Sequence, residues 1–550
     1  MNFKKNESAQ KLRGGYYTPV DLASFISKWV AKKEPKTILE PSCGDGVFFQ
    51  TLSATELAES TKITAFELSE CEAKKAASRA HELHLSADIW SRDFLGWALS
   101  EIVEGGARFD AVVGNPPFIR YQYLPKDFQE TAEKIFRQLG CKFTKHTNAW
   151  VPFVLASVAL LRPGGRIGLV VPAEVIHVMH AQSLRSFLGT ECKRMVIIDP
   201  EQLWFDGTLQ GAVILLAEKR CADADSCEGL GIVSVHDREF VLQDPEELFN
   251  APNTVNGKTV EGKWTRALLP SDTLELLGAM EEHPNIHRFD DIAEVDVGIV
   301  TGANKFFLVP VETVKRYGLQ EYAHPMFGRS EHCPGIVYDQ RQHERNAENG
   351  KPTHFIWFRD DSVIRNKSVK RYIAIGEQQE LHTRFKCRTR SPWYSVPSVY
   401  ATDIGMLKRS HNAPRLILNE ARAFTTDTAY RIRSTAVTAD TLVGCFLNPL
   451  TALSAELEGR HYGGGVLELV PSEIERLIIP LPLETDIKLA SLDQDIRTNP
   501  IADVLRENGS RVLSNVGVGQ AERQLLLESW AALRNRRQRV SRKAQEGSAS

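Results

Sequence analysis

Paired cysteines are missing from this chain of 550 residues. It has nine cysteines, none of which stands in a Cys-x-x-Cys pair, and the nearest two are Cys221 and Cys227. Scattered thiols in an odd number do not predict a disulfide framework or a zinc site. We therefore expect reduced cysteines, a cytoplasmic location and no bound metal.

Long apolar runs and a strong charge of one sign are also absent. No run approaches the roughly 18 apolar residues of a membrane-spanning helix. The start, MNFKKNESAQKLRGG, has no apolar core after its lysines, so it does not predict a secretory signal. The formal net charge is −3, so any surface for nucleic acid has to be local. We expect no membrane partner, and we expect a monomer.

From Thr37 to about Lys219, short β-rich runs alternate with helix-like stretches. The runs are TILEPS, KITAFELS, FDAVVGN, GRIGLVVPA, RMVIIDPEQ and GAVILLAEK. This alternation predicts an α/β fold, doubly wound, with a mainly parallel sheet and helices on both of its faces. No obvious helix separates the last two runs, so we expect one of them to be antiparallel at the sheet edge.

The pattern changes after Lys219. A loop-like CADADSCEGLG is followed by short apolar runs with many Gly, Pro and Asn and no βα rhythm. These features predict a second domain of the α+β class and a helical C-terminal end. The predicted limits are 1–222 for the first domain, 223–285 for a linker, 286–485 for the second domain and 486–550 for a helical region with a basic tail.

The stretch ILEPSCGDGVFF places a strand, a turn and a helix start in succession. Glu40 ends the strand, and Gly44 and Gly46 lie in the turn, where glycine lets backbone N–H groups approach a ligand. The spacing lacks the full Gly-x-Gly-x-x-Gly pattern and does not suit a pyrophosphate. An acidic strand end suits a positively charged ligand, such as the ammonium of a methionine moiety. An ordinary βα turn is the alternative, and this loop alone does not decide between the two.

Two later strand ends extend this pocket. Glu67, in TAFELS, is placed to accept both hydroxyls of a ribose. Asp93 can accept from an adenine amino group while Phe94 packs on the ring. Each has a plainer interpretation: Glu67 as an acid at a helix start, Asp93 as a solvated acid and Phe94 as a core residue. Together, at successive strand ends, the three predict one adenosine-binding pocket.

The apolar run FDAVVG stops abruptly at Asn115-Pro116-Pro117-Phe118. Proline has no N–H and a fixed φ, so two in succession end a strand and stiffen the turn that follows. Either this is a sharp turn with an aromatic residue by chance, or the turn is rigid because something must be held there.

These motifs resemble those of the S-adenosylmethionine-dependent N6-adenine DNA methyltransferases. Their order along the chain is that of the gamma class, the Taq-type enzymes of restriction–modification systems. GGYYTP resembles their N-terminal motif, which closes over the methionine end of the cofactor through Tyr17, Thr18 and Pro19. LEPSCGDG, which contains Pro41 and Ser42, resembles their glycine loop. FEL, DFL and GNPPF resemble the ribose-binding acid, the adenine-binding pair and the catalytic tetrapeptide.

The resemblance covers residues from about Gly14 to Lys219 and has departures. Ser42 stands where many members have Gly or Ala, and Phe118 stands where Tyr is commoner. A looser resemblance to the recognition domains of such enzymes continues through VGIVTGANKFFLV and YGGGVLELVPSEIERLIIPLP.

The resemblance implies the seven-stranded sheet of class I methyltransferases, S-adenosylmethionine as cofactor and a C-terminal target-recognition domain. It also implies site-specific methylation of adenine in double-stranded DNA, as the modification enzyme of a type II system with a cognate restriction endonuclease. Only 13 residues precede Gly14, too few for a cleavage domain, which favours a nuclease on a separate chain.

The tetrapeptide suggests how an adenine amino group, whose lone pair is delocalised into the ring, becomes nucleophilic. The side-chain oxygen of Asn115 and the carbonyl of Pro116 are expected to accept its two N–H bonds. Phe118 and, by resemblance, Phe205 in LWFDG are expected to stack on the base after it leaves the duplex. For Phe205, an ordinary core aromatic is the alternative.

Two stretches of the second domain suggest DNA contacts. TRFKCRTRSPWY interleaves aromatic residues with cations suited to phosphates; the cations are Arg384, Lys386, Arg388 and Arg390. A solvated strand face is the alternative. LNEARAFTTDTAYRI offers residue types that read base edges; they are Asn419, Arg422, Thr426 and Asp427. The basic C-terminal helix is either a backbone contact or a solvated tail.

Two other functions remain open. Methyltransferases acting on protein glutamine or on RNA also use Asn-Pro-Pro-aromatic, but they usually carry a smaller substrate domain before the catalytic one, whereas about 330 residues follow it here. A catalytically silent DNA-binding relic is the second alternative. The intact Asn115–Phe118 and Glu67 argue against it, because a relic would tolerate the loss of Asn115.

Overall fold

The computed structural model describes residues 17–57, 59–201, 204, 211–221, 226–359, 361–462, 464–483 and 487–538. The chain forms two compact units, of which the first runs to Leu268 and the second from Leu269 to Gln538. None of the helices within the described ranges is long and apolar enough to cross a membrane.

The first unit is built on one eight-stranded sheet with the order β3-β2-β1-β4-β5-β7-β6-β8. The strands are β1 (Thr37–Glu40), β2 (Lys62–Phe66), β3 (Ser86–Trp90), β4 (Phe109–Gly114), β5 (Leu161–Pro172), β6 (Cys192–Pro200), β7 (Ala212–Lys219) and β8 (Gly229–Val235). All neighbours pair in parallel except that β7 runs antiparallel to both β5 and β6. The strand order reverses between β1 and β4, and in open α/β sheets ligands bind beyond the carboxyl ends of the strands at such a point.

The predicted doubly wound α/β class is confirmed, with two corrections to the sheet. The antiparallel strand β7 is inside the sheet and not at its edge, because it returns beside β6 and also pairs with β5 over Arg166–Pro172. An eighth strand, β8, follows β6 in parallel at the edge. It lies within 223–285, the segment that the sequence suggested as a linker, so much of that segment is folded into the first unit.

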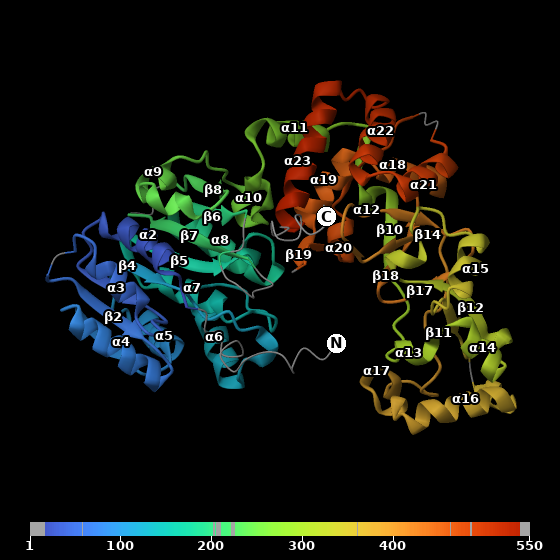
Figure 1. Ribbon diagram of the computed structural model, residues 1–550, viewed down its shortest axis with the longest axis horizontal. Coiled ribbons are helices and arrows are strands. Elements are labelled where there is room, and N and C mark those ends of the chain that lie inside the picture. Colours follow the sequence, from blue (N-terminus) through green and yellow to red (C-terminus); the bar gives the residue numbers. More distant parts are fainter. Residues whose placement is uncertain are drawn as a thin grey trace, which may run out of the picture. The chain divides into compact units, whose positions relative to one another are not determined.

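Helices cover both faces of the sheet (Figure 1). Alternate residues of β4 explain why: Val112 packs into one buried cluster, while Ala111 and Val113 pack into the other. The helices on the first side are α5 (Phe94–Glu104), α6 (Lys126–Gln138), α7 (Trp150–Ala159), α8 (Gln182–Glu191) and α10 (Lys258–Glu261). Those on the second side are α2 (Val20–Ala31), α3 (Val47–Ser53), α4 (Glu70–Glu82) and α9 (Pro245–Asn250).

The helices begin and end where the sequence provides caps. Asp93 caps α5, because its carboxylate accepts hydrogen bonds from the backbone N–H groups of Leu95 and Gly96, and Gly105 ends the helix at φ +70°. In α4, alanines at helical spacing face the core, with Glu70 in the first turn and Arg79 in the last, which suits the helix dipole.

The second unit is of the α+β class, as predicted. Its sheets have the orders β10-β18-β14-β16, β11-β13-β12-β17, β15-β20-β19 and β21-β9. Their strands are β9 (Ile286–Arg288), β10 (Ala293–Val297), β11 (Leu308–Val309), β12 (Ala323–Phe327), β13 (His354–Ile356), β14 (Ile404–Leu407), β15 (Arg409–Ser410), β16 (Leu416–Leu418), β17 (Phe424–Thr425), β18 (Ala429–Ser434), β19 (Arg460–Tyr462), β20 (Val466–Glu468) and β21 (Ile478–Pro480). A largely aromatic cluster that includes Phe306, Phe307 and Phe355 packs beneath the second of these sheets.

The helices of the second unit include the predicted C-terminal ones. They are α11 (Ser271–Glu281), α12 (Phe289–Ile292), α13 (Asn304–Phe307), α14 (Val311–Tyr317), α15 (Gln340–Glu348), α16 (Lys367–Gln378), α17 (Phe385–Arg388), α18 (Ala439–Phe446), α19 (Pro449–Glu458), α20 (Pro471–Ile474), α21 (Leu489–Thr498), α22 (Ile501–Ser514) and α23 (Gln520–Gln538). Both α22 and α23 pack against α19, so the helical end belongs to this unit and is not a separate region. Residues 539–550 of the basic tail lie outside the described residues.

Candidate active site

The predicted tetrapeptide lies at the carboxyl end of β4, where the strand order reverses. Leu39 of β1 pairs with Val112 of β4, so the ends of these two strands are neighbours. Asn115 follows β4 directly and is partly buried. The structure therefore brings the predicted catalytic motif beside Glu40 and its glycine loop.

Asn115 is held by residues from two other predicted motifs. The Ser42 hydroxyl donates a hydrogen bond to the backbone carbonyl of Asn115 at 3.0 Å. The Asn115 side-chain Nδ2 donates to the hydroxyl oxygen of Thr18, itself buried, at 3.1 Å. Since the amide has one oxygen and one nitrogen, fixing Nδ2 on Thr18 also fixes the direction of Oδ1. Three segments distant in sequence thus meet at one residue.

Glu40 offers the clearest sign of a ligand. Its side chain is 1% exposed, and neither carboxylate oxygen has a hydrogen-bond partner in the part of the chain that the structure describes. Burial, reinforced by the carboxylates of Glu67 and Asp45, raises the pKa of Glu40 well above its ordinary value. A buried carboxylate without a partner is costly, and a cationic group of a ligand relieves that cost. Two carboxylate oxygens that can accept hydrogen bonds fit the ammonium of a methionine moiety.

The glycine loop is closed by Glu67. One oxygen of its carboxylate accepts from the backbone N–H of Gly44 at 3.0 Å and the other from that of Ser69 at 2.8 Å. Gly46 has φ +87°, and a Cβ there would lie 2.8 Å from the Phe49 ring, so glycine is required for the helix to start this close. Glu67 is thus both an acid at a helix start and a clamp on the loop; its contact with a ribose stays a prediction.

The two residues of the predicted adenine-binding pair have different environments in the structure. Asp93 is exposed in the turn between β3 and α5, and its carboxylate caps α5. Phe94 is 2% exposed and packs against Phe66, Trp97 and Phe153, which favours its core interpretation. An apolar side chain that is exposed at this edge is Leu68, 77% exposed, directly after Glu67. The sequence analysis did not consider Leu68 for the pocket, although it directly follows Glu67 at the end of the strand.

The N-terminal motif is partly described. Pro19 precedes α2 as its cap residue, and the hydroxyl of exposed Tyr17 donates to Glu72 at 3.4 Å. Among the residues of this motif that the structure describes, Thr18 is the one hydrogen-bonded to Asn115. Phe205, the predicted second stacking residue, lies outside the described residues.

Phe118 is partly buried and packs against the core clusters on both faces of the sheet. The segment after it is anchored by polar residues that the sequence did not suggest. Asn148 accepts from the backbone N–H of Tyr121 at 3.1 Å and donates to Glu174 at 2.8 Å. Trp150 donates to the same Glu174 oxygen at 2.9 Å. The sequence signal for this anchor was Glu174, an acidic residue two positions after the apolar strand β5.

Comparisons with known proteins agree with this geometry. Residues 2–230 match the family model described as N-6 DNA Methylase, and residues 261–513 match that of the C-terminal domain of Type II methyltransferase M.Eco57I. Type II methyltransferase M.AccI of Acinetobacter calcoaceticus is 23% identical over 481 residues, which is 84% of this chain and 84% of that protein. M.XamI of Xanthomonas campestris pv. amaranthicola is 21% identical over 501 residues, 85% of each chain.

The chain is a DNA methyltransferase of a restriction–modification system, and it is similar along most of its length to the N6-adenine enzymes of such systems. It is a DNA-binding methyltransferase whose cofactor is S-adenosylmethionine. Among solved structures, that of the type IIG restriction endonuclease BpuSI has 15% identity and a TM-score of 0.44, and the match covers 96% of this chain and 67% of that one.

In the second unit of the methyltransferase, the predicted phosphate-contacting cations lie on and around α17 and not on a strand. Arg384, Lys386 and Arg388 are exposed. Arg390 is half-buried and donates to the backbone carbonyls of Thr301 at 2.8 Å and Val300 at 2.5 Å. Its guanidinium is thus used in packing, so a DNA contact is best supported for the other three.

The predicted base-reading residues separate by burial. Asn419 is 4% exposed, and its amide bonds to the backbone of Thr402 and Ala423. Thr426 is 1% exposed and shares a hydrogen bond with another threonine. Both therefore shape the turn, whereas Arg422 and Asp427 are exposed and available to DNA.

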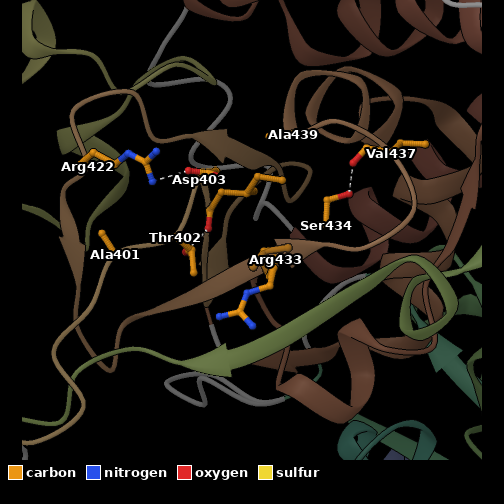
Figure 2. Close-up of a pocket in the computed structure, with 10 residues that line it drawn as sticks. Ala401, Thr402, Asp403, Arg422, Arg433, Ser434, Val437 and Ala439 are labelled. Carbon is orange, nitrogen blue, oxygen red and sulfur yellow. Dashed lines mark hydrogen bonds and ion pairs between the residues drawn. The ribbon is translucent and has the colours of Figure 1, made fainter.

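A cavity of about 310 Å³ opens beside Arg422 (Figure 2). Its lining includes Asp403 and Arg433. Arg422 has φ +50°, a left-handed backbone rare for its type, and its guanidinium is 2.6 Å from the Asp403 carboxylate. A carboxylate that holds a guanidinium in one orientation is suited to directing it at a base edge, and this role for Arg422 stays a prediction.

Proposed function

We propose that this methyltransferase modifies the N6 amino group of an adenine that has been flipped out of duplex DNA, as the modification enzyme of a type II restriction–modification system. The observation that carries the proposal is Asn115-Pro116-Pro117-Phe118 at the carboxyl end of β4, with Asn115 tied to Thr18 and Ser42. An acceptor pair on a rigid turn suits an exocyclic amino group, which presents two N–H bonds.

Each residue of the turn has a separate role in the proposed reaction. The side-chain oxygen of Asn115 and the carbonyl of Pro116 accept the two N–H bonds, which draws the nitrogen toward a tetrahedral shape and frees its lone pair. The fixed φ of the prolines keeps the acceptors in place, so orientation supplies much of the rate effect. Phe118 packs against one face of the base. One proton leaves the nitrogen for water after transfer, so no general base is assigned.

The proposed cofactor site centres on Glu40. S-adenosylmethionine would supply an electrophilic methyl group there and would leave as S-adenosylhomocysteine. Glu40 would hold the ammonium of its methionine part, Glu67 would accept hydrogen bonds from the ribose hydroxyls, and Asp93 would accept one from the adenine amino group. Thr18 and Ser42 keep Asn115 oriented toward the same site.

Partners and location follow from this activity. A separate restriction endonuclease that cuts the same DNA sequence completes the system, and the methyltransferase acts as a monomer in the cytoplasm, where the DNA is. The exposed cations Arg384, Lys386 and Arg388 neutralise phosphates of the duplex.

The test uses a host that lacks adenine methylation. The wild-type chain and Asn115→Ala are expressed in parallel, and genomic DNA is sequenced with modification-sensitive reads. N6-methyladenine confined to one short sequence in the wild type alone is the expected result. Labelled methyl transfer to RNA or protein, with none to unmodified DNA, would overturn the proposal.

A further inference from the structure

Phe385, the first residue of α17, is 64% exposed. The other aromatic residues of the same stretch are packed: Tyr394 is 3% exposed, and the Trp393 ring lies 5.3 Å from that of Phe306. Single exposed apolar residues are common on proteins and need no function. The surroundings of Phe385 are what distinguish it.

Cations lie against the Phe385 ring. The Lys386 ammonium is 5.7 Å from the ring centroid and the Arg388 guanidinium is 5.5 Å from it. From His382 to Arg390 the chain has four Lys or Arg residues and no acid. An exposed aromatic ring among cations suits a polyanion that also carries flat rings, which is the chemistry of nucleic acid.

The backbone under Phe385 is firmly held. Cys387 is fully buried, and Arg390 donates to the carbonyls of Val300 and Thr301. Gly302 has φ +75°, and a Cβ there would lie 2.7 Å from the Lys386 Cβ, so the two segments are in close contact. Because the ring is carried on a fixed backbone, little conformational entropy is lost when it meets a ligand.

We propose that Phe385 is a DNA-stacking residue: its ring packs on a base exposed by local unstacking of the bound duplex, while Lys386 and Arg388 contact the flanking phosphates. The proposal rests on the proposed function and deepens it by giving the second unit an apolar contact with DNA. The base that Phe385 contacts is distinct from the target adenine, for which Phe118 provides the packing surface. Aromatic side chains of DNA-bending proteins act on base steps in this way.

The test measures dissociation constants by fluorescence anisotropy for two 30-base-pair duplexes, one fully paired and one with a single bulged base. A bulged base is already unstacked, so a stacking residue binds it at lower cost. Wild type is expected to prefer the bulged duplex. Phe385→Ala should lose roughly 5- to 150-fold in affinity for it, the range for loss of one base–aromatic stack, while Phe385→Trp should retain it.

Two controls separate stacking from charge and from general surface change. Lys386→Gln and Arg388→Gln should each lower the slope of log affinity against log salt by about one, whereas Phe385→Ala should leave the slope unchanged. Leu483→Ala removes another exposed apolar side chain of the second unit, 92% exposed, and should bind both duplexes as wild type does.

The proposal is overturned if Phe385→Ala binds the bulged duplex as tightly as wild type, or if wild type has no preference between the duplexes. Methyl transfer from labelled cofactor to unmodified genomic DNA is measured on the same preparations. Absence of that transfer in wild type would count against the proposed function, and the comparison of dissociation constants would still be readable.

Discussion

The side-chain amide of Asn115 donates to the Thr18 hydroxyl oxygen at 3.1 Å, across 97 positions of sequence. This bond directs the amide so that its nitrogen faces Thr18, which also fixes the direction of its oxygen. In the proposed reaction, this contact gives the N-terminal motif a second role beside the cofactor, because it sets which atom of Asn115 would face the base. Thr18 is a positioning residue in this arrangement.

Thr18→Val should lower kcat by about tenfold, because the isosteric change removes the acceptor and lets the Asn115 amide rotate. Thr18→Ser keeps the hydroxyl and should stay near the wild-type kcat. Both variants are assayed with labelled cofactor at saturating DNA. Equal losses in the two variants, or a change in KM for DNA with kcat intact, would contradict a positioning role.

Glu40→Gln should have opposite effects on cofactor binding and on stability. The variant keeps the shape of the side chain but loses the charge that faces the cofactor ammonium in the proposed site, so the dissociation constant for S-adenosylmethionine should rise by roughly 10- to 150-fold. Isothermal titration measures it. A matched change at an exposed acid, Glu70→Gln, should leave cofactor affinity unchanged.

The stability effect of Glu40→Gln depends on pH. The folded-state pKa of Glu40 is raised above its ordinary value, so the stability it contributes is full at low pH and is lost as pH rises through the folded pKa. As pH rises above 4.5, the ordinary pKa of this carboxyl, the free energy of unfolding of the cofactor-free variant should therefore increase relative to that of wild type. Urea unfolding at several pH values checks this, and a constant difference would contradict it.

Phe118 packs against both core clusters, so its removal would confuse stability with function. Phe118→Leu fills much of the same space but lacks a flat face, whereas Phe118→Tyr keeps the ring. Leu should slow transfer and weaken the hold on the flipped base by roughly 5- to 150-fold, and Tyr should not. The fluorescence of 2-aminopurine at the target position reports flipping. Similar signals from the two variants would show that the Phe118 ring does not stack on the flipped base.

The sequence predicted those parts of the site that lie in contiguous motifs. Glu40 with its glycine loop, and Asn115 with its prolines, stand at strand ends that a βα rhythm locates, and the structure places them there. The ring of Phe94 was harder to place, because neighbouring residues at a strand end point in different directions. Its burial against Phe153 depends on a helix that begins more than fifty residues later.

Long-range contacts were not predictable from local patterns. The Asn148–Glu174 hydrogen bond joins two ordinary polar residues that have no common motif. The strand β8 was missed because an acidic, loop-like stretch precedes it and its partner β6 is not its neighbour along the chain. Likewise, the segment of α17 was expected to contact DNA or to be a solvated strand face, and the burial of Cys387 with the packing of Arg390 on Thr301 shows which side of it is buried.

The end of α23 is held by a buried ion pair. Arg537 and Glu456 both have fully buried side chains, with Nη2 2.7 Å from Oε1 and Nε 2.9 Å from Oε2. Arg537 also donates to the backbone carbonyls of His411, Asn412 and Gly465. One cation of the basic C-terminal helix is therefore structural and is not available to DNA.

Arg537→Met should lower the free energy of unfolding by about 3–5 kcal/mol, because it leaves a buried carboxylate without its cation. Burial already outweighs Arg537 and raises the pKa of Glu456, so the loss should be smaller at pH 5, where the carboxyl is more readily protonated, than at pH 8. Urea unfolding followed by circular dichroism measures the loss. The double variant Arg537→Met with Glu456→Leu should recover much of the loss, since an apolar pair avoids the uncompensated charge. If the double variant were no more stable than Arg537→Met alone, the hydrogen bonds from Arg537 to the three carbonyls, and not the ion pair, would be what holds the end of α23.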